Sequence, residues 1–145
     1  MDVSVLRKRI LRALDEAKHD LSQRRTLIDE ATAAYERFLA DIAVPLLRQS
    51  AMVLSAADQP FQVHTPASSA RLAHDQSPLT FLELELDVTG PRPQVIGRVS
   101  LTRGRRGQLV EERPVAANKA VAELTEEDLS AFLVAEIPKL VVRSS

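Results

Sequence analysis

The sequence predicts an α+β fold: a long N-terminal helix, an antiparallel meander of three to four strands, and a C-terminal helix packed on the sheet. Three observations support this fold class. Residues 2–57 contain no glycine and a single proline, Pro45, which favours a long helix. After residue 78, segments that alternate apolar and polar residues are separated by turns containing Gly and Pro. After Thr125, apolar residues recur with helical spacing. We therefore divide the chain into a helical segment, 1–58, and a small head, 59–145.

The apolar residues of the first helix recur at alternating intervals of three and four, which places them in one stripe along the helix. Over four to five heptads, such spacing is typical of a coiled-coil seam. Arg24 interrupts the stripe. We interpret it either as a device that fixes the register of two helices or as a sign that the stripe serves two different neighbours. The stripe consists of Ile10, Leu14, Ala17, Leu21, Ile28, Ala31, Tyr35, Phe38 and Ile42.

The predicted helix is long for a chain of 145 residues. About 55 helical residues would extend roughly 80 Å, whereas a compact domain of this size has a radius of gyration near 15 Å. The helix therefore either overhangs the rest of the protein or bends or breaks at Pro45, since proline removes a helical hydrogen bond. An overhanging apolar stripe needs a partner; a stripe that packs on the chain's own sheet does not.

We expect the first arrangement, with two copies associating through the helix as a homodimer. The sequence leaves open whether the two helices run parallel or antiparallel. The residues expected to form the oligomerisation seam are Ile10, Leu14, Leu21, Ile28, Tyr35 and Phe38.

The second half of the chain predicts the meander. Residues 66–78 are expected to form a loop, with at most a short edge strand at 70–73. Strand 108–115 should lie at an edge of the sheet, because Pro114 cannot donate a hydrogen bond to a neighbouring strand. The other segments expected to be strands are 61–65, 79–88 and 93–102.

The charges suggest how the strands pair. If residues 89–92 form the first hairpin turn, Glu83 lies opposite Arg98. If residues 103–107 form the second hairpin turn, with Thr102 closing against Gly107, Arg98 also lies opposite Glu111. Both registers place Arg98 between two glutamates on the outer face and direct the apolar residues to the other face.

A C-terminal helix should begin after Thr125, which can cap it, and three acidic residues follow in the first turn. Pro138 should kink this helix or end its regular part. The expected apolar face, which we place against the inner face of the sheet, consists of Leu129, Phe132, Leu133, Ile137 and Leu140.

The composition narrows the functional classes. A formal net charge of −1 gives no overall preference for nucleic acid or an anionic membrane, and the absence of cysteine excludes disulfides and thiol chemistry. An aromatic content of 3% leaves little for stacking on bases. We find neither a signal-peptide core nor a segment expected to span a bilayer, and so expect a cytoplasmic protein. No motif predicts a cofactor or a metal.

Two groups of residues could nevertheless carry chemistry. A basic hairpin tip formed by Arg103, Arg105 and Arg106 could contact phosphate. Loop 64–75 contains His64, His74 and Asp75, which could form the site of a small enzyme or hold a metal ion, although no ligand-pair spacing supports this.

The function predicted from these patterns is that of a non-enzymatic interaction or adaptor protein, which self-associates through its long helix and docks an unidentified protein partner with its head. A nucleic-acid-associated protein that uses the arginine tip is the first alternative. A small enzyme with its site in loop 64–75 is the second.

Overall fold

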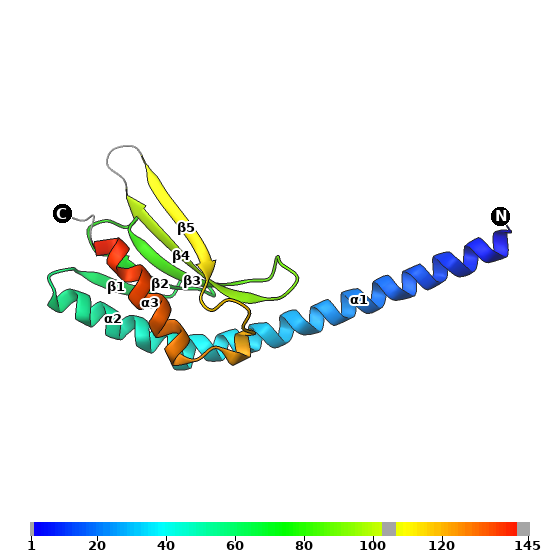
Figure 1. Ribbon diagram of the computed structural model, residues 1–145, viewed down its shortest axis with the longest axis horizontal. Coiled ribbons are helices and arrows are strands. Elements are labelled where there is room, and N and C mark those ends of the chain that lie inside the picture. Colours follow the sequence, from blue (N-terminus) through cyan, green and yellow to red (C-terminus); the bar gives the residue numbers. More distant parts are fainter. Residues whose placement is uncertain (1, 103–106, 142–145) are drawn as a thin grey trace.

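The computed structural model describes residues 2–102 and 107–141 (Figure 1). An antiparallel sheet carries helices on one face, and one helix projects far beyond it, so the predicted α+β class is confirmed. We call residues 2–23 the extension and residues 24–102 and 107–141 the body. The helical elements are α1 (Val3–Phe38), η1 (Leu39–Ala43), α2 (Val44–Ala56), η3 (Val121–Glu123) and α3 (Glu126–Val141). The strands are β1 (Phe61–His64), β2 (Ala70–His74), β3 (Phe81–Asp87), β4 (Gln94–Thr102) and β5 (Gln108–Pro114).

The first helix neither breaks nor folds back at Pro45. Instead, α1 continues through the π-helical turn η1 into α2, and Pro45 lies in the first turn of α2. The backbone N–H of Val44 bonds to the carbonyl of Leu39, five residues earlier, which is the π pattern. Proline has no N–H to donate to the carbonyl one turn earlier, and its ring crowds that turn. The wider π-helical turn just before Pro45 makes room for the ring. The result is one long, shallowly curved helix (Figure 1).

The sheet has five strands in the order β1-β2-β3-β4-β5, one or two more than predicted. The additional strand is β2, which we expected to be loop or edge. It pairs with both β1 and β3 and therefore lies inside the sheet. Its residues Ala70, Leu72 and Ala73 are all buried, but two of them are alanines, so the apolar alternation in the sequence is weak.

The register predicted for the first hairpin is confirmed, because Glu83 pairs with Arg98. The register predicted for the second is wrong by one residue: Arg98 pairs with Glu112, and Glu111 lies on the inner face. Gly107 has φ of 132°, a conformation that few residues other than glycine adopt, and it extends the connection by one residue before β5 begins.

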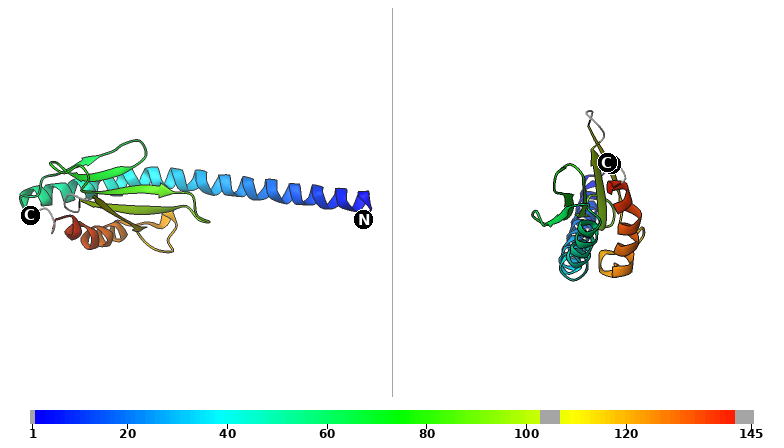
Figure 2. Two further views of the ribbon diagram at one scale, coloured as in Figure 1. Left: turned by 90° about the horizontal axis from the view of Figure 1, so that it is seen from above. Right: turned by 90° about the vertical axis from the view of Figure 1, so that its left-hand side faces the viewer.

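All the helices that cover the sheet lie on its inner face, and the two views in Figure 2 show α2 and α3 side by side beneath the strands. The second half of α1 and all of α2 contribute to the same core as α3 and the strands. The core therefore joins segments from both halves of the sequence. Its residues that are almost wholly buried include Tyr35, Leu47, Leu72, Leu82, Leu84, Leu129, Phe132 and Leu140.

Helix α3 begins as predicted and does not end at Pro138. The hydroxyl of Thr125 accepts from the N–H of Asp128 (3.2 Å), and the Asp128 carboxylate accepts from the N–H of Thr125 (2.9 Å), which is a reciprocal cap. The helix then runs through Pro138 to Val141. The carbonyl that loses its donor belongs to Val134, whose side chain is 75% exposed, so that side of the helix faces water.

Candidate interaction surfaces

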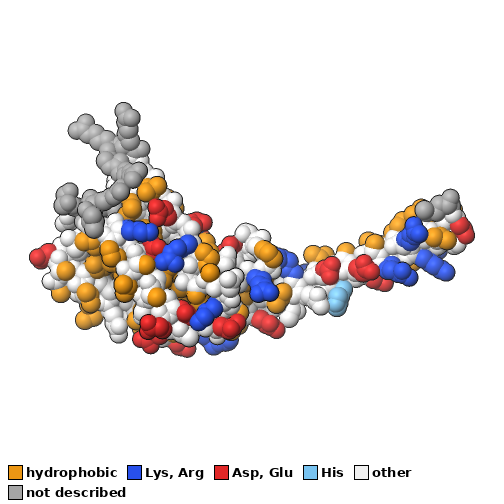
Figure 3. Space-filling model, in the orientation of Figure 1, with side chains coloured by type: hydrophobic (Ala, Val, Ile, Leu, Met, Phe, Trp, Pro, Cys, Tyr) orange, Lys and Arg blue, Asp and Glu red, His pale blue; other side chains and the backbone are white. Residues whose placement is uncertain are grey.

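The extension carries an apolar stripe that nothing else in the described chain covers (Figures 1 and 3). Half of the surface of Ile10 and Leu14 is exposed, and two thirds of that of Leu21. Val3, Leu6 and Leu11 flank the stripe, and each is 46% to 79% exposed. Contiguous exposed apolar residues of this kind mark interaction surfaces in folded proteins.

The second half of the predicted seam packs on the chain's own core. Tyr35 and Phe38 are 2% and 4% exposed, and Ile28 is half-buried. The hydroxyl of Tyr35 donates to the carbonyl of Leu84 (3.2 Å). Burial raises the pKa of Tyr35 well above its ordinary value, and the negative charges of nearby glutamates raise it further. These two aromatic residues are therefore anchors of the body in this structure, as the own-core alternative predicted for the stripe.

Arg24 stands at the boundary between the exposed and the covered parts of the stripe. Its guanidinium donates to the carbonyls of Val88 (2.5 Å) and Gly90 (3.1 Å), in the turn between β3 and β4. Beyond Arg24 the stripe therefore meets the chain's own core, while a second neighbour on the extension stays a prediction. The sequence shows the interruption, but not the carbonyl partners more than sixty residues away.

Charge is unevenly distributed along the extension, as the blue and red side chains of Figure 3 show. Residues 3–12 contain four basic residues and no acidic one; residues 13–22 contain three acidic residues and one lysine. The basic residues are Arg7, Lys8, Arg9 and Arg12, and Asp15, Glu16, Lys18 and Asp20 follow them. Helical spacing places Arg7 within the apolar stripe and Lys18 and Asp20 beside it, and the other five farther around the helix.

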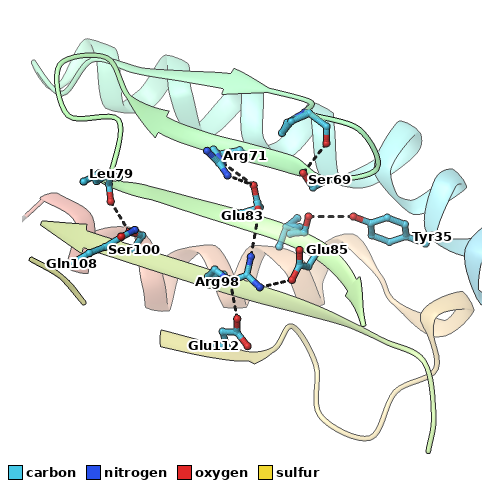
Figure 4. A network of polar contacts seen from close by, with 12 residues as sticks. Tyr35, Ser69, Arg71, Leu79, Glu83, Glu85, Arg98, Ser100, Gln108 and Glu112 are labelled. Carbon is cyan, nitrogen blue, oxygen red and sulfur yellow. Dashed lines mark hydrogen bonds and ion pairs between the residues drawn. The ribbon is translucent and has the colours of Figure 1, made fainter. Parts of the chain in front are cut away.

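The outer face of the sheet carries a network of ion pairs (Figure 4). Glu83, only 5% exposed, is held by Arg71 (2.7 Å) and Arg98 (3.2 Å). Arg98 also contacts Glu85 (2.5 Å) and Glu112 (2.7 Å), and its hydrogen bond to Glu112 raises its pKa although burial opposes the shift. Because these carboxylates already bind arginines, the network holds strands together and offers no ready cation site.

The structure does not bring the three residues of loop 64–75 together. His64 pairs with Arg71 at one end of the β1–β2 hairpin, whereas His74 pairs with Phe61 at the other end and on the opposite face. The ring of His74 packs edge-on against that of Phe61, at 5.1 Å between centroids. Within residues 2–102 and 107–141, no group of three or more His, Cys, Asp or Glu side chains is placed to hold a metal ion.

The arginine tip falls on residues 103–106, outside the described part of the chain, so its predicted role stays a prediction. By length and composition alone, one helix, Val3–Ala56, meets the criterion for crossing a membrane, with an 18-residue window of mean hydropathy 1.3 that is 22% buried. Length and composition do not test our expectation that no segment spans a bilayer, which stays a prediction. The core helix of a soluble protein passes the same test.

The described part of the body contains hollows that were not predicted from the sequence, among them two that border the long helix. One, of about 470 Å³, lies between α1 and residues 118–123, where Ala31 and Ala34 leave space. Its lining mixes carboxylates with cations, and Lys119 there is already paired with Asp128 (2.8 Å). The other, of about 400 Å³, is a mostly apolar groove between α2 and α3. Neither hollow gathers a set of catalytic groups.

Comparison of the chain with protein-family models, with curated proteins and with solved structures finds no match.

Proposed function

We propose that this protein is a non-enzymatic interaction protein that binds a second copy of itself through the extension. The observation that carries the proposal is the exposed stripe of Ile10, Leu14 and Leu21, which projects from the body on a continuous helix. The body is then the part that each copy presents to other molecules.

Two physical arguments support a partner for the extension. Most helices in proteins gain their stability by packing an apolar face, and the side chains of the extension do not contribute to the core of the described body. Covering half-exposed Leu and Ile side chains also releases about 25 cal/mol for each Å² of apolar surface removed from water. A partner therefore stabilises both the helix and the stripe.

A second copy fits the stripe because its spacing is that of a coiled-coil seam. Two identical seams bury each other when they meet about a two-fold axis, which closes the assembly at a dimer. The alternating intervals of three and four between Ile10, Leu14, Ala17 and Leu21 provide the knobs for such packing.

Sedimentation equilibrium across micromolar concentrations tests the proposal. We expect the wild type to dimerise and the variant Leu14→Asp with Leu21→Asp to be monomeric with an unchanged near-ultraviolet spectrum. The matched control is Met52→Asp with Val134→Asp, since these residues are 73% and 75% exposed but lie on the body; it should still dimerise. A monomeric wild type would overturn the proposal, as would a double stripe variant that dimerises like the wild type.

A further inference from the structure

We infer that the two extensions pair in opposite directions over residues 3–21, so that the two bodies stand at opposite ends of the pair. This inference rests on the self-association proposed above and specifies its geometry. Three features carry it: the position of the body, the order of apolar residues, and the order of charges.

The body stands where a parallel partner would have to pass. Beyond Arg24 the stripe turns toward the body's own core, in which Tyr35 and Phe38 are buried. A parallel partner helix would continue along this stripe and meet the body. Because the pair is symmetric, the two bodies would overlap in the space between the two helices. In an antiparallel pair, the partner's first helical turn, which Asp2 caps, lies beside residue 21, just before the turn that Arg24 binds.

The apolar residues match in this antiparallel arrangement. With the two-fold axis near residue 12, Val3 lies beside the partner's Leu21, and Ile10 lies beside the partner's Leu14. Each pair occurs twice, so Val3 and the stripe residues Ile10, Leu14 and Leu21 all gain an apolar neighbour, while Ala17 lies beside the partner's Arg7. The overlap of 19 residues spans roughly 28 Å at 1.5 Å per residue.

Other antiparallel registers fit less well. A shift of one heptad toward the body would place Arg7 beside the partner's Arg24, bringing two cations together. It would also drive the partner helix against the turn that holds Arg24. A shift of one heptad the other way would leave Leu21 without a neighbour.

The charges favour the same direction. In a parallel pair, the basic residues 3–12 of both copies would lie side by side and repel. In the antiparallel pair they lie along residues 12–21 of the partner, which include Asp15, Glu16 and Asp20. Most of these charges lie outside the seam, so they act at longer range and bias the direction of pairing more than they add affinity.

The two directions give very different molecules. In the antiparallel pair, the two Phe38 residues lie roughly 80 Å apart, because 26 helical residues separate each from the axis. In a parallel pair they would be neighbours. The antiparallel pair therefore presents two identical bodies far apart and facing outward, a geometry that can bridge two copies of whatever the body binds.

The absence of cysteine makes the direction directly measurable, because a single introduced thiol can carry a spin label. With a label on Val3→Cys, we expect the two labelled residues to lie roughly 27 Å apart in the antiparallel pair, to which the label linkers add. In a parallel pair the two residues would be separated only by the distance between the helix axes, roughly 10 Å. Ala13→Cys, next to the axis, is the matched control, and its labels should be close together in either direction. Sedimentation of each labelled protein shows whether it is paired.

A long distance at position 3 with a short distance at position 13 is the expected result. Short distances at both positions would overturn the antiparallel inference but leave self-association standing. Long distances at both, in a protein that sediments as a dimer, would also overturn the inference, because the interface would then lie elsewhere. A monomer at the labelling concentration would overturn the proposed function together with the inference.

Discussion

At the scale of single residues, the packing of α3 on the sheet depends on Gly97, which has no side chain and so leaves room for Phe132. A Cβ atom at position 97 would lie 2.0 Å from Cζ of Phe132. Phe132 is 2% exposed, and the guanidinium of Arg113 lies 4.4 Å from its ring centroid. The ring is therefore held on its other sides and cannot easily give way to a methyl group.

We predict that Gly97→Ala lowers the free energy of unfolding by about 1–3 kcal/mol, the usual cost of overfilling a packed core. Urea denaturation followed by circular dichroism measures this. Gly90→Ala is the control, because a Cβ atom there meets nothing closer than the Arg92 carbonyl oxygen at 3.9 Å. Equal effects of the two substitutions would show that the close approach of Phe132 does not limit residue 97.

Single residues also show what a sequence can predict. The position of Arg98 among glutamates could be predicted from strand alternation and charge, because Arg98 and these glutamates lie on neighbouring strands. The role of Arg24 could be narrowed to two interpretations but not decided. Its partners are backbone carbonyls at Val88 and Gly90, and carbonyls are present at every residue. Side-chain patterns cannot single out such a contact.

At the scale of elements, α3 is tied to β5 by an ionic cluster. Glu136 is 4% exposed and contacts Arg113 of β5 (2.6 Å) and Lys139 of its own helix (2.9 Å). Burial alone would raise the pKa of Glu136, but the hydrogen bonds and charges of the two cations outweigh it and hold the pKa below its ordinary value of 4.5.

A carboxyl group whose pKa is lower in the folded state contributes stability that is fully present above its unfolded pKa and is lost as pH falls through the folded pKa. We therefore predict that the wild type loses stability as pH falls below about 4.5 and that Glu136→Gln is less stable at pH 7 with a shallower loss in acid. Urea midpoints across pH 7 to 3 measure both. The exposed Glu36, replaced by Gln, is the control; a wild-type slope in Glu136→Gln would contradict the assignment.

The elements differ in how well their sequences predict them. Strands β3 and β4 alternate strongly, so their register follows from the pattern, and their limits differ from the predicted ones by at most two residues. Strand β2 consists partly of alanines, and its place between β1 and β3 depends on pairing that composition does not encode. The π-helical turn before Pro45 could not be predicted from the sequence. Proline predicts that the regular helix is disturbed, but a kink, a break or a π-helical turn can each relieve the disturbance.

At the scale of the whole molecule, the extension and the body are separable. The core cluster, together with the half-buried residues that pack on it, begins at Ala31, so no side chain of residues 2–23 contributes to it. Arg24, which binds the β3–β4 turn, stays with the body when the chain is cut before Ser22.

We predict that a protein beginning at Ser22 folds with the same urea midpoint as the full chain, compared at a concentration where the full chain is monomeric, because association itself adds stability. It should not associate at any higher concentration. Far-ultraviolet circular dichroism and sedimentation measure the two properties. A truncated protein that fails to fold would show that the extension supports the body, and one that still dimerises would place the interface on the body.

The absence of a hinge between extension and body has a mechanical consequence. The helix that forms the tip is the same helix that lies in the core, and Arg24 clamps it to the β3–β4 turn where it emerges. Residues 3–23 therefore act as a stiff lever of roughly 30 Å. A sideways load at the tip arrives as torque on the strands β3 and β4, rather than being absorbed by a flexible linker.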